Sequence, residues 1–405
     1  MGVPSMVGAP PFLPQGGYSR DTKEEYQVRN GFRVIDADAH FYEPKDIWDK
    51  YVEPEYYDDR PRVTRVLGKI MHEYEDGTSQ PVARAKTLFS QMEAKFGHAF
   101  RDNWSLSSRI KDMDEEGWDI QVCLPTNGGG GGAGNDKPGL AAALCRAYNN
   151  WAHDFCSDAH QRVKFTALVP GQDIDGMVIE THRAINELGA VSLMLPDAIP
   201  EKMWHHKDYD PMWETAQDLD FPLSLHGANS GNPAANTRYL TSPGPFVALQ
   251  ETIGFPFENM ISLGHFIFSG ILDRFPNLRL LILESTSGWV PFWLNRLEKY
   301  CEGRQSVFFD EHPLKLTPQE YFNRHCAVAA DADEPTIKYV IDYIGDDHVV
   351  FNTDYPHPDA PATNEPLSNM MAQPLSKDTM TKVLWDNSVR IYGQRLIQGH
   401  PLATH

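Results

Sequence analysis

Five short apolar runs in this chain each end on residues that can bind a metal or move a proton. They end at Asp38-Ala39-His40, His226, His265, Glu284 and Asp354. A run of four to six aliphatic residues indicates a strand that is buried on both faces. One polar strand end is unremarkable, but five in chain order indicate that the strand ends meet at one place. A closed parallel barrel, which carries its active site at the carboxyl ends of its strands, has this geometry.

Four of these residues, Asp38, His40, His226 and Asp354, form the predicted metal site. Positions i and i+2 of an extended chain point to the same side, so Asp38 and His40 can both face the barrel mouth. Asp36 is expected on that face too, deeper in. Imidazole and carboxylate ligands together suit Zn²⁺ or Mn²⁺, so we expect one divalent metal of either kind. Asp354 is either a fourth ligand or a general base that accepts a proton from water.

The two other polar strand ends, His265 and Glu284, are catalytic candidates together with Asp354. The predicted ligand set is already nearly complete without His265. We therefore expect His265 to act as an acid, a base or an electrostatic stabiliser beside the metal. Glu284 either orients His265 or pairs with a basic residue in the barrel.

The elements that must position these residues alternate between strands and helices. The predicted strands cover about 32–38, 120–125, 164–169, 190–195, 221–226, 259–265, 278–284 and 348–354. Predicted helices between them include 109–117, 140–157 and 211–219. Eight strands that alternate with helices predict an α/β fold of the (β/α)8 TIM-barrel type.

Two segments fall outside this alternation. Residues 1–30 are rich in Pro and Gly and then in charge, which predicts an N-terminal arm that does not fold alone. Residues 41–108 form a long insertion after the first strand, and this position predicts a lid over the barrel mouth. The barrel domain is expected to span 31–400. The glycine-rich segment 127–134 lacks the spacing of a phosphate-binding motif and is expected to be a flexible loop.

Charge and cysteine content limit the partners. The 36 Lys and Arg residues against 56 Asp and Glu residues give a net charge of −20, which argues against nucleic acid and anionic membrane. Five cysteines without CxxC spacing fit a reducing compartment. No apolar stretch approaches transmembrane length, so we expect a cytoplasmic protein that acts on a small molecule. The apolar, Pro-rich stretch 10–14 predicts a homo-oligomer, most simply a dimer.

Several aromatic and basic residues are candidates for substrate binding. Tyr42 and Trp104, both in the insertion, suggest a planar or apolar substrate. Arg109 is a candidate for binding a carboxylate. His357, at the end of the segment Asn352-Thr353-Asp354-Tyr355-Pro356-His357, is a further candidate.

Several motifs resemble the amidohydrolase-2 family, which includes aminocarboxymuconate-semialdehyde decarboxylase and related aromatic-acid decarboxylases. These motifs are Asp38-Ala39-His40-Phe41-Tyr42-Glu43-Pro44, Leu225-His226-Gly227, Gly264-His265, Glu284-Ser285-Thr286-Ser287-Gly288-Trp289-Val290-Pro291 and Thr353-Asp354-Tyr355-Pro356-His357. The similarity runs from about residue 32 to 395. It implies a single metal bound by the strand-one pair, the strand-five His and the strand-eight Asp, with a catalytic His on strand six.

Two departures from the family pattern bear on the reaction. Asp38 stands where many members carry His, which resembles the decarboxylase subset and favours a harder metal such as Mn²⁺. Phe268 stands where several of those decarboxylases carry a Glu, three residues after the strand-six His.

We therefore expect a hydrolase that acts on an amide, ester, lactone or activated C–C bond. The alternative is non-oxidative decarboxylation of an aromatic or unsaturated acid. A binding protein without activity is a third alternative, and the complete ligand set argues against it.

Overall fold

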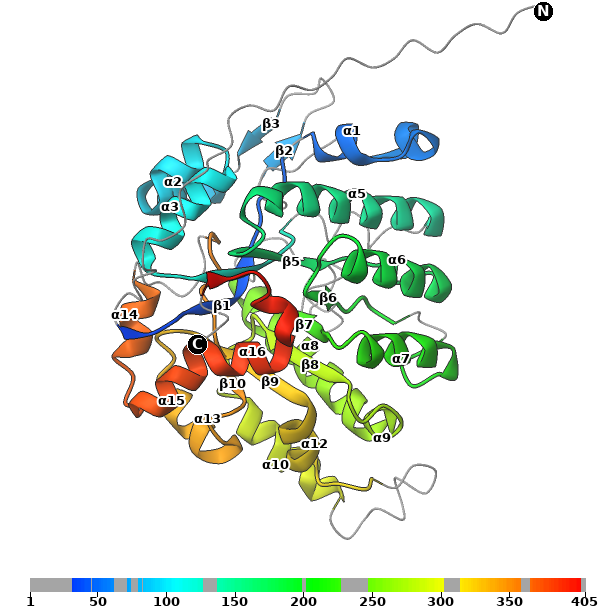
Figure 1. Ribbon diagram of the computed structural model, residues 1–405, viewed down its shortest axis with the longest axis vertical. Helices are drawn as coiled ribbons and strands as arrows, with labels where there is room; N and C mark the ends of the chain where they lie inside the picture. Colours follow the sequence, from blue (N-terminus) through cyan, green and yellow to red (C-terminus); the bar gives the residue numbers. More distant parts are fainter. Residues whose placement is uncertain are drawn as a thin grey trace, which may run out of the picture.

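Eight parallel strands form the centre of the molecule in a computed structural model (Figure 1). The structure describes residues 31–44, 46–61, 71–73, 79–81, 83–126, 137–198, 202–226, 247–301, 314–357 and 365–401. The barrel strands are β1 (Ile35–His40), β4 (Ile120–Leu124), β5 (Val163–Ala167), β6 (Ser192–Met194), β7 (Pro222–His226), β8 (Arg279–Leu283), β9 (Cys326–Ala330) and β10 (Val349–Phe351). Each pairs with the next in chain order, which confirms the predicted TIM barrel.

Helices surround the strands on the outside of the barrel (Figure 1). They are α1 (Ile47–Tyr51), α2 (Ala83–Arg101), α3 (Leu106–Glu116), α5 (Pro138–Cys156), α6 (Ile174–Asn186), α7 (Asp210–Asp218), α8 (Val247–Phe268), α9 (Ile271–Arg274), α10 (Val290–Cys301), α12 (Pro318–His325), α13 (Ile337–Ile344), α14 (Pro366–Met371), α15 (Lys377–Thr381) and α16 (Asn387–Tyr392). Short 3-10 turns cover Pro54–Asp59, Ser157–Ala159, Lys207–Tyr209 and Gln394–Leu396, and a π-helical turn covers Lys382–Asp386.

The barrel closes where β1 meets the segment that follows β10. The N–H of Asp354 donates to the carbonyl of Asp38 at 2.9 Å, and the N–H of His40 donates to the carbonyl of Tyr355 at 2.6 Å. Three of these four residues are candidate site residues, and the fourth, Tyr355, lies directly beside Asp354. The seam of the barrel therefore passes through the predicted site.

Buried Asp36 strengthens the same seam. Its carboxylate accepts hydrogen bonds from the N–H of Thr353 at 3.0 Å, from the Thr353 hydroxyl at 2.5 Å and from the Gln121 side chain at 2.9 Å. Burial raises the pKa of Asp36 to about 6, against the lowering effect of these hydrogen bonds. Asp36 thus links β1, β4 and the end of β10, which is a structural role.

Two strand predictions need correction. Residues 259–265 lie inside helix α8, and β9 completes the barrel although no strand was predicted there. The predicted strand at 278–284 is observed as β8 and is the sixth strand of the barrel. Within α8, Leu263 and Phe266 are buried whereas Phe257 and Ile261 are exposed, which is the pattern of an outer helix.

The insertion after β1 carries helices of its own. Helices α1, α2 and α3 lie between β1 and β4, together with an antiparallel pair of short strands, β2 (Met71–Glu73) and β3 (Ser79–Pro81). The predicted arm at 1–30 and the glycine-rich loop at 127–134 lie outside the described residues. A lid function for the insertion stays a prediction. No helix in the described ranges combines the length and apolar character that a membrane span needs.

Candidate metal centre

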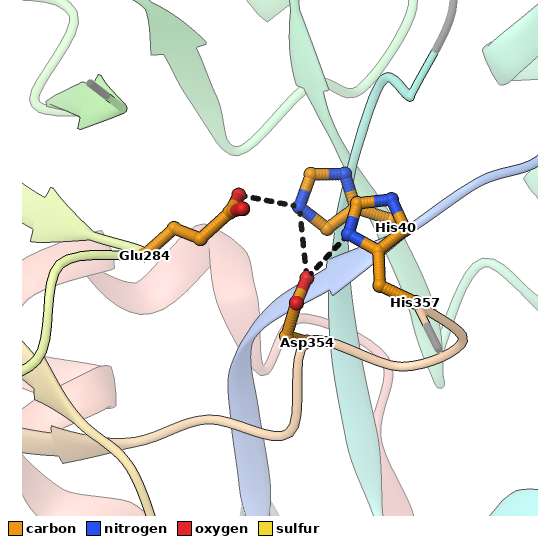
Figure 2. A group of neighbouring side chains, drawn as sticks. All are labelled: His40, Glu284, Asp354 and His357. Atoms are coloured by element: carbon orange, nitrogen blue, oxygen red, sulfur yellow. Dashed lines mark ion pairs between the residues drawn. The ribbon is translucent and has the colours of Figure 1, made fainter. Parts of the chain in front are cut away.

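Five side chains meet at the carboxyl ends of β1, β7, β8 and β10. The Nε2 atom of His40 lies 3.4 Å from Oε2 of Glu284, 3.4 Å from Oδ1 of Asp354 and 3.6 Å from Oδ1 of Asp38. It also lies 3.4 Å from Nε2 of His226, which itself contacts Oε2 of Glu284. Figure 2 shows Glu284 and Asp354 directed toward His40 from different strands. The structure thus brings Asp38, His40, His226 and Asp354 together, and Glu284 joins them.

A β-bulge in β1 determines which of its polar residues face this cluster. Asp36 pairs with Gln121 and Ala39 pairs with Cys123, so two residues of β1 lie opposite one residue of β4. The bulge breaks the simple alternation, as bulges near active sites often do. Asp38 and His40 face the cluster, while Asp36 bonds to Gln121 and Thr353. The expectation that Asp36 shares the face of Asp38 is therefore wrong.

The hydrogen bonds of His40 fix the orientation of its ring. Its Nδ1 lies 3.2 Å from the carbonyl oxygen of Pro125, which suits an N–H donor at that position. The other nitrogen, Nε2, then points to the cluster in the form that binds metals. Burial lowers the pKa of His40 to about 3, with the neighbouring His357 as the next cause. His40 is consequently neutral at physiological pH.

The carboxylates of the cluster fit a bound cation. Asp38 is completely buried, and neither of its oxygens makes a well-formed hydrogen bond with a described residue. Burial raises the pKa of Asp38 well above its ordinary value, and the charges of Glu284 and Asp354 raise it further. Burial also opposes ionisation of Glu284, but His226 and His40 hold its pKa below the ordinary value. A divalent cation among these oxygens would offset both the burial and the mutual repulsion.

Two carboxylates of the cluster stand on left-handed backbone. The φ angles are 48° at Glu284 and 51° at Asp354. Residues with a side chain rarely adopt this region, and each costs of order 1–3 kcal/mol unless its surroundings hold it there. Both residues come directly after a strand or a few residues beyond it, where the backbone must turn to present the side chain to the barrel axis. Such strain is typical of functional sites.

The family of the chain follows from comparison with known proteins. A family model described as amidohydrolase matches residues 35–394. The chain belongs to the amidohydrolase family. The resemblance noted in the motifs is thereby confirmed, and the chain is an enzyme of the amidohydrolase fold.

The chain matches curated relatives that are named as decarboxylases. It is 24% identical over 270 residues to 2-amino-3-carboxymuconate-6-semialdehyde decarboxylase from Dictyostelium discoideum, which covers 66% of this chain and 71% of the relative. It is 24% identical over 293 residues to gamma-resorcylate decarboxylase from Polaromonas sp., which covers 70% of this chain and 86% of the relative.

Solved structures support the same fold. A 5-carboxyvanillate decarboxylase from Novosphingobium aromaticivorans, solved with manganese and 4-hydroxy-3-methoxy-5-nitrobenzoic acid, has a TM-score of 0.66 at 21% identity and covers 90% of this chain and 97% of its own. An amidohydrolase from Mycobacterium avium subsp. paratuberculosis has a TM-score of 0.68 at 20% identity and covers 90% of this chain and 100% of its own.

These relatives contradict the expectation of hydrolysis. That expectation rested on Phe268, which was placed three residues after a His at the end of the sixth strand. In the structure His265 and Phe268 both lie in helix α8, so Phe268 does not occupy the position where an acid was expected. Glu284, which follows β8, is the residue at the end of the sixth strand.

His265 does not belong to the cluster of five side chains. Its Nε2 lies 3.3 Å from Nδ1 of His205, and the two rings are stacked. Burial lowers the pKa of His265 to about 4, and His205 contributes to the shift. The predicted strand position was the reason for expecting catalysis by His265, and that position was wrong. Of the two roles predicted for Glu284, pairing with a basic group in the barrel agrees with its contacts to His226 and His40.

The predicted substrate residues divide into two groups. His357 stacks on His40 with ring centroids 4.1 Å apart, and Tyr42 lies 6.0 Å from His357 and 5.1 Å from Trp104. Arg109, in contrast, is almost fully buried, and its guanidinium donates to the His40 carbonyl and, at 2.9 Å, to Gln121. Arg109 therefore stabilises the end of β1 by hydrogen bonding, and its buried position argues against direct contact with a substrate.

Lys95 is a residue near the site that sequence reasoning missed. It lies on α2, is partly buried, and interacts favourably with the charges of Asp354 and Glu116. Burial nevertheless lowers the pKa of Lys95 below its ordinary value. A lysine in an insertion helix carries no sequence signal that would distinguish it from other surface lysines.

Proposed function

We propose that this protein is a metal-dependent, non-oxidative decarboxylase of an aromatic or unsaturated carboxylic acid. The observation that carries the proposal is the convergence of three carboxylates and two imidazoles at the barrel mouth, in a chain whose curated relatives are decarboxylases. The substrate class follows from the activities for which those relatives are named and from the aromatic residues beside the cluster.

Asp38, His40, His226 and Asp354 would hold the metal, with Glu284 as a fifth candidate. Oxygen-rich ligand sets favour harder ions, so Mn²⁺ is our first choice and Zn²⁺ the second. The manganese in the related 5-carboxyvanillate decarboxylase supports this order. When bound, the ion would supply positive charge to the substrate's carboxylate and an adjacent oxygen.

The remaining chemistry is proton delivery. Decarboxylation breaks the bond between the carboxyl group and its carbon, leaves the electron pair on that carbon and releases CO2. The carbon then needs one proton. Asp354 and His357 form the pair that suits this task, because Oδ1 of Asp354 lies 2.8 Å from Nδ1 of His357. The other ring nitrogen of His357 lies 2.9 Å from the Thr126 hydroxyl, which fixes the ring.

A planar acid fits the surroundings of this pair. Tyr42 and Trp104 form an aromatic wall next to His357, and Phe96 of α2 extends it with its ring 5.9 Å from Trp104. Aromatic rings at such distances offer faces and edges on which a benzoate ring can pack. Lys95, on the same helix as Phe96, would supply positive charge for an anionic substrate.

The test is turnover in heavy water by the Mn²⁺-loaded protein. We expect CO2 release from 2,6-dihydroxybenzoate or 5-carboxyvanillate, with deuterium on the carbon that carried the carboxylate. Asp354→Asn should reduce the rate by about 10²-fold or more, since proton transfer typically contributes that much. Asp175→Asn, at an exposed position on α6, is the matched control and should keep the wild-type rate. A metal-loaded protein that releases no CO2 from a panel of aromatic and unsaturated acids would contradict the proposal.

A further inference from the structure

The segment that carries Glu284 into the cluster needs an external support. Glu284 has a φ angle of 48° and Thr286 one of 54°, so two residues of the short stretch 284–288 stand on left-handed backbone. Neither is a glycine, and such conformations persist only where neighbouring groups over-determine them. The hydrogen bonds of this stretch should therefore reveal what holds Glu284 in place.

Glu334, in the loop after β9, is the principal support. It is 7% exposed. Its Oε2 accepts from the N–H of Ser287 at 2.9 Å and from the Ser287 hydroxyl at 2.9 Å. Its Oε1 accepts from the Thr336 hydroxyl at 2.6 Å. Hydrogen bonds to a carboxylate are about twice as strong as neutral ones.

The backbone next to this carboxylate packs closely against it. A Cβ atom at Gly288 would lie 2.6 Å from Oγ1 of Thr336 and 3.0 Å from Oε1 of Glu334, so only glycine fits there without a shift. The backbone of Glu334 is anchored too. Its N–H donates to the carbonyl of Asp331 at 3.1 Å, and its carbonyl accepts from the Gln373 side chain at 3.3 Å.

We propose that Glu334 is a positioning residue that holds Glu284 in the metal cluster by fixing the backbone of residues 284–288. The proposal rests on the proposed function only in taking the cluster as a metal site. Glu334 itself acts through Ser287, and among the described residues its carboxylate makes no hydrogen bond with the five clustered side chains.

The primary test compares Mn²⁺ dissociation constants of the full-length protein without substrate. Glu334→Gln keeps the size of the side chain but replaces one carboxylate oxygen with an NH2 group and removes the charge, so Ser287 and Thr336 can no longer both donate to it. We expect the Kd for Mn²⁺ to rise by about 10- to 100-fold, the usual effect of losing a residue that orients a ligand. Glu320→Gln is the matched control. Glu320 closes the capping box of α12 with Thr317, so its loss should lower the thermal midpoint and leave the Kd unchanged.

A double-mutant cycle separates positioning from general destabilisation. If Glu334 acts through Glu284, then Glu334→Gln should add little to the Kd in a Glu284→Gln background, whereas independent effects would multiply. Ser287→Ala removes one of the two bonds and should raise the Kd by a smaller factor. Ser287→Ala also provides the test if Glu334→Gln does not fold.

Wild-type Kd values in folded Glu334→Gln or in Ser287→Ala would overturn the proposal, and so would multiplicative effects in the cycle. Absence of Mn²⁺ binding by the wild-type protein would overturn it as well. Normal Mn²⁺ binding without CO2 release would instead count against the decarboxylase function alone, so the two failures are distinguishable.

Discussion

At the scale of single residues, the cluster depends on which imidazole nitrogen each His turns toward it. His40 and His226 both present Nε2, 3.4 Å apart. We expect His226→Ala to lower the content of bound Mn²⁺ or Zn²⁺ at least about tenfold, because a neutral nitrogen ligand is lost without replacement. Elemental analysis after dialysis measures this.

The control for that experiment is His265→Asn. His265 lies in α8 and contacts His205, away from the cluster. It should keep the wild-type metal content. Equal loss of metal from the two variants would show that His226 has no special place in the site.

Lys95 gives a second prediction at this scale. Replacing it with Met keeps the length of the side chain and removes its charge. We expect the KM for an aromatic acid to rise about tenfold, equivalent to about 1.4 kcal/mol, with a smaller change in kcat. Lys111→Met is the control, because Lys111 lies on α3 in an exposed pair with Glu115 at 3.6 Å. Unchanged KM values in Lys95→Met would remove Lys95 from the substrate site.

At the scale of elements, buried Asp119 ties the starts of β1 and β4. Its Oδ2 accepts from the N–H of Val34 at 2.7 Å, and its own N–H donates to the Val34 carbonyl at 2.9 Å. Burial raises the pKa of Asp119 to about 6, above the ordinary value of 3.8. A raised pKa means that the folded state holds this proton more tightly than the unfolded state. Its stabilising effect is complete below about pH 4 and is lost as the pH rises through about 6.

Comparison with Asp119→Asn isolates this contribution, because Asn can still accept from Val34. The free energy of unfolding of the wild type, relative to the variant, should fall by up to about 1.4 kcal/mol per pH unit between about pH 4 and 6. Urea unfolding at several pH values measures the difference. A difference that does not vary with pH would mean that Asp119 titrates normally in the folded state.

Sequence patterns located some elements of the site well. β1, β7 and the strand before Asp354 are apolar runs with a polar end. This pattern is typical of parallel barrel strands, because both faces of such a strand are buried. The run Met260–Leu263 has the same appearance but lies in α8. A run this short, with three apolar residues in four positions, fits a buried strand and the buried side of a helix equally, so periodicity cannot separate the two.

Other features could not be predicted from the chain. β9 consists of Cys-Ala-Val-Ala-Ala, and its small side chains resemble neither a typical strand nor a helix face. The bulge in β1 depends on pairing with β4, so strict alternation placed Asp36 with Asp38. The position of Glu284 within the cluster could be recognised only from the strand order, in which β8 is the sixth strand of the barrel.

At the scale of the whole molecule, metal removal should lower stability. The ligands come from strands far apart in the chain, so the unfolded state cannot assemble them, and a metal that binds only the folded state stabilises it. At a free Mn²⁺ concentration about 100 times the Kd, the gain is about 2.7 kcal/mol. Thermal unfolding with Mn²⁺ and after treatment with a chelator should show a higher midpoint with metal. Equal midpoints would indicate that the cluster does not bind Mn²⁺.

We also expect a homodimer in solution. The exposed side chains of Phe257, Ile261 and Phe292 on α8 and α10 are large and apolar, and such residues often mark contact surfaces. Light scattering at micromolar concentration measures the mass, and a monomer would contradict the prediction. Deletion of residues 1–28 tests whether the predicted arm contributes, since an unchanged mass would exclude it.

The seam between β1 and the end of β10 has a consequence for how the protein is made. Thr353 and Asp36, bonded across it, are 317 positions apart. A ribosome produces Asp38 and His40 early and Asp354 near the end, while domains tend to form as the chain emerges. A nascent chain that stops before β10 lacks Asp354 and the backbone bonds that hold β1 beside it. The proposed metal cluster is therefore complete only after translation has passed β10.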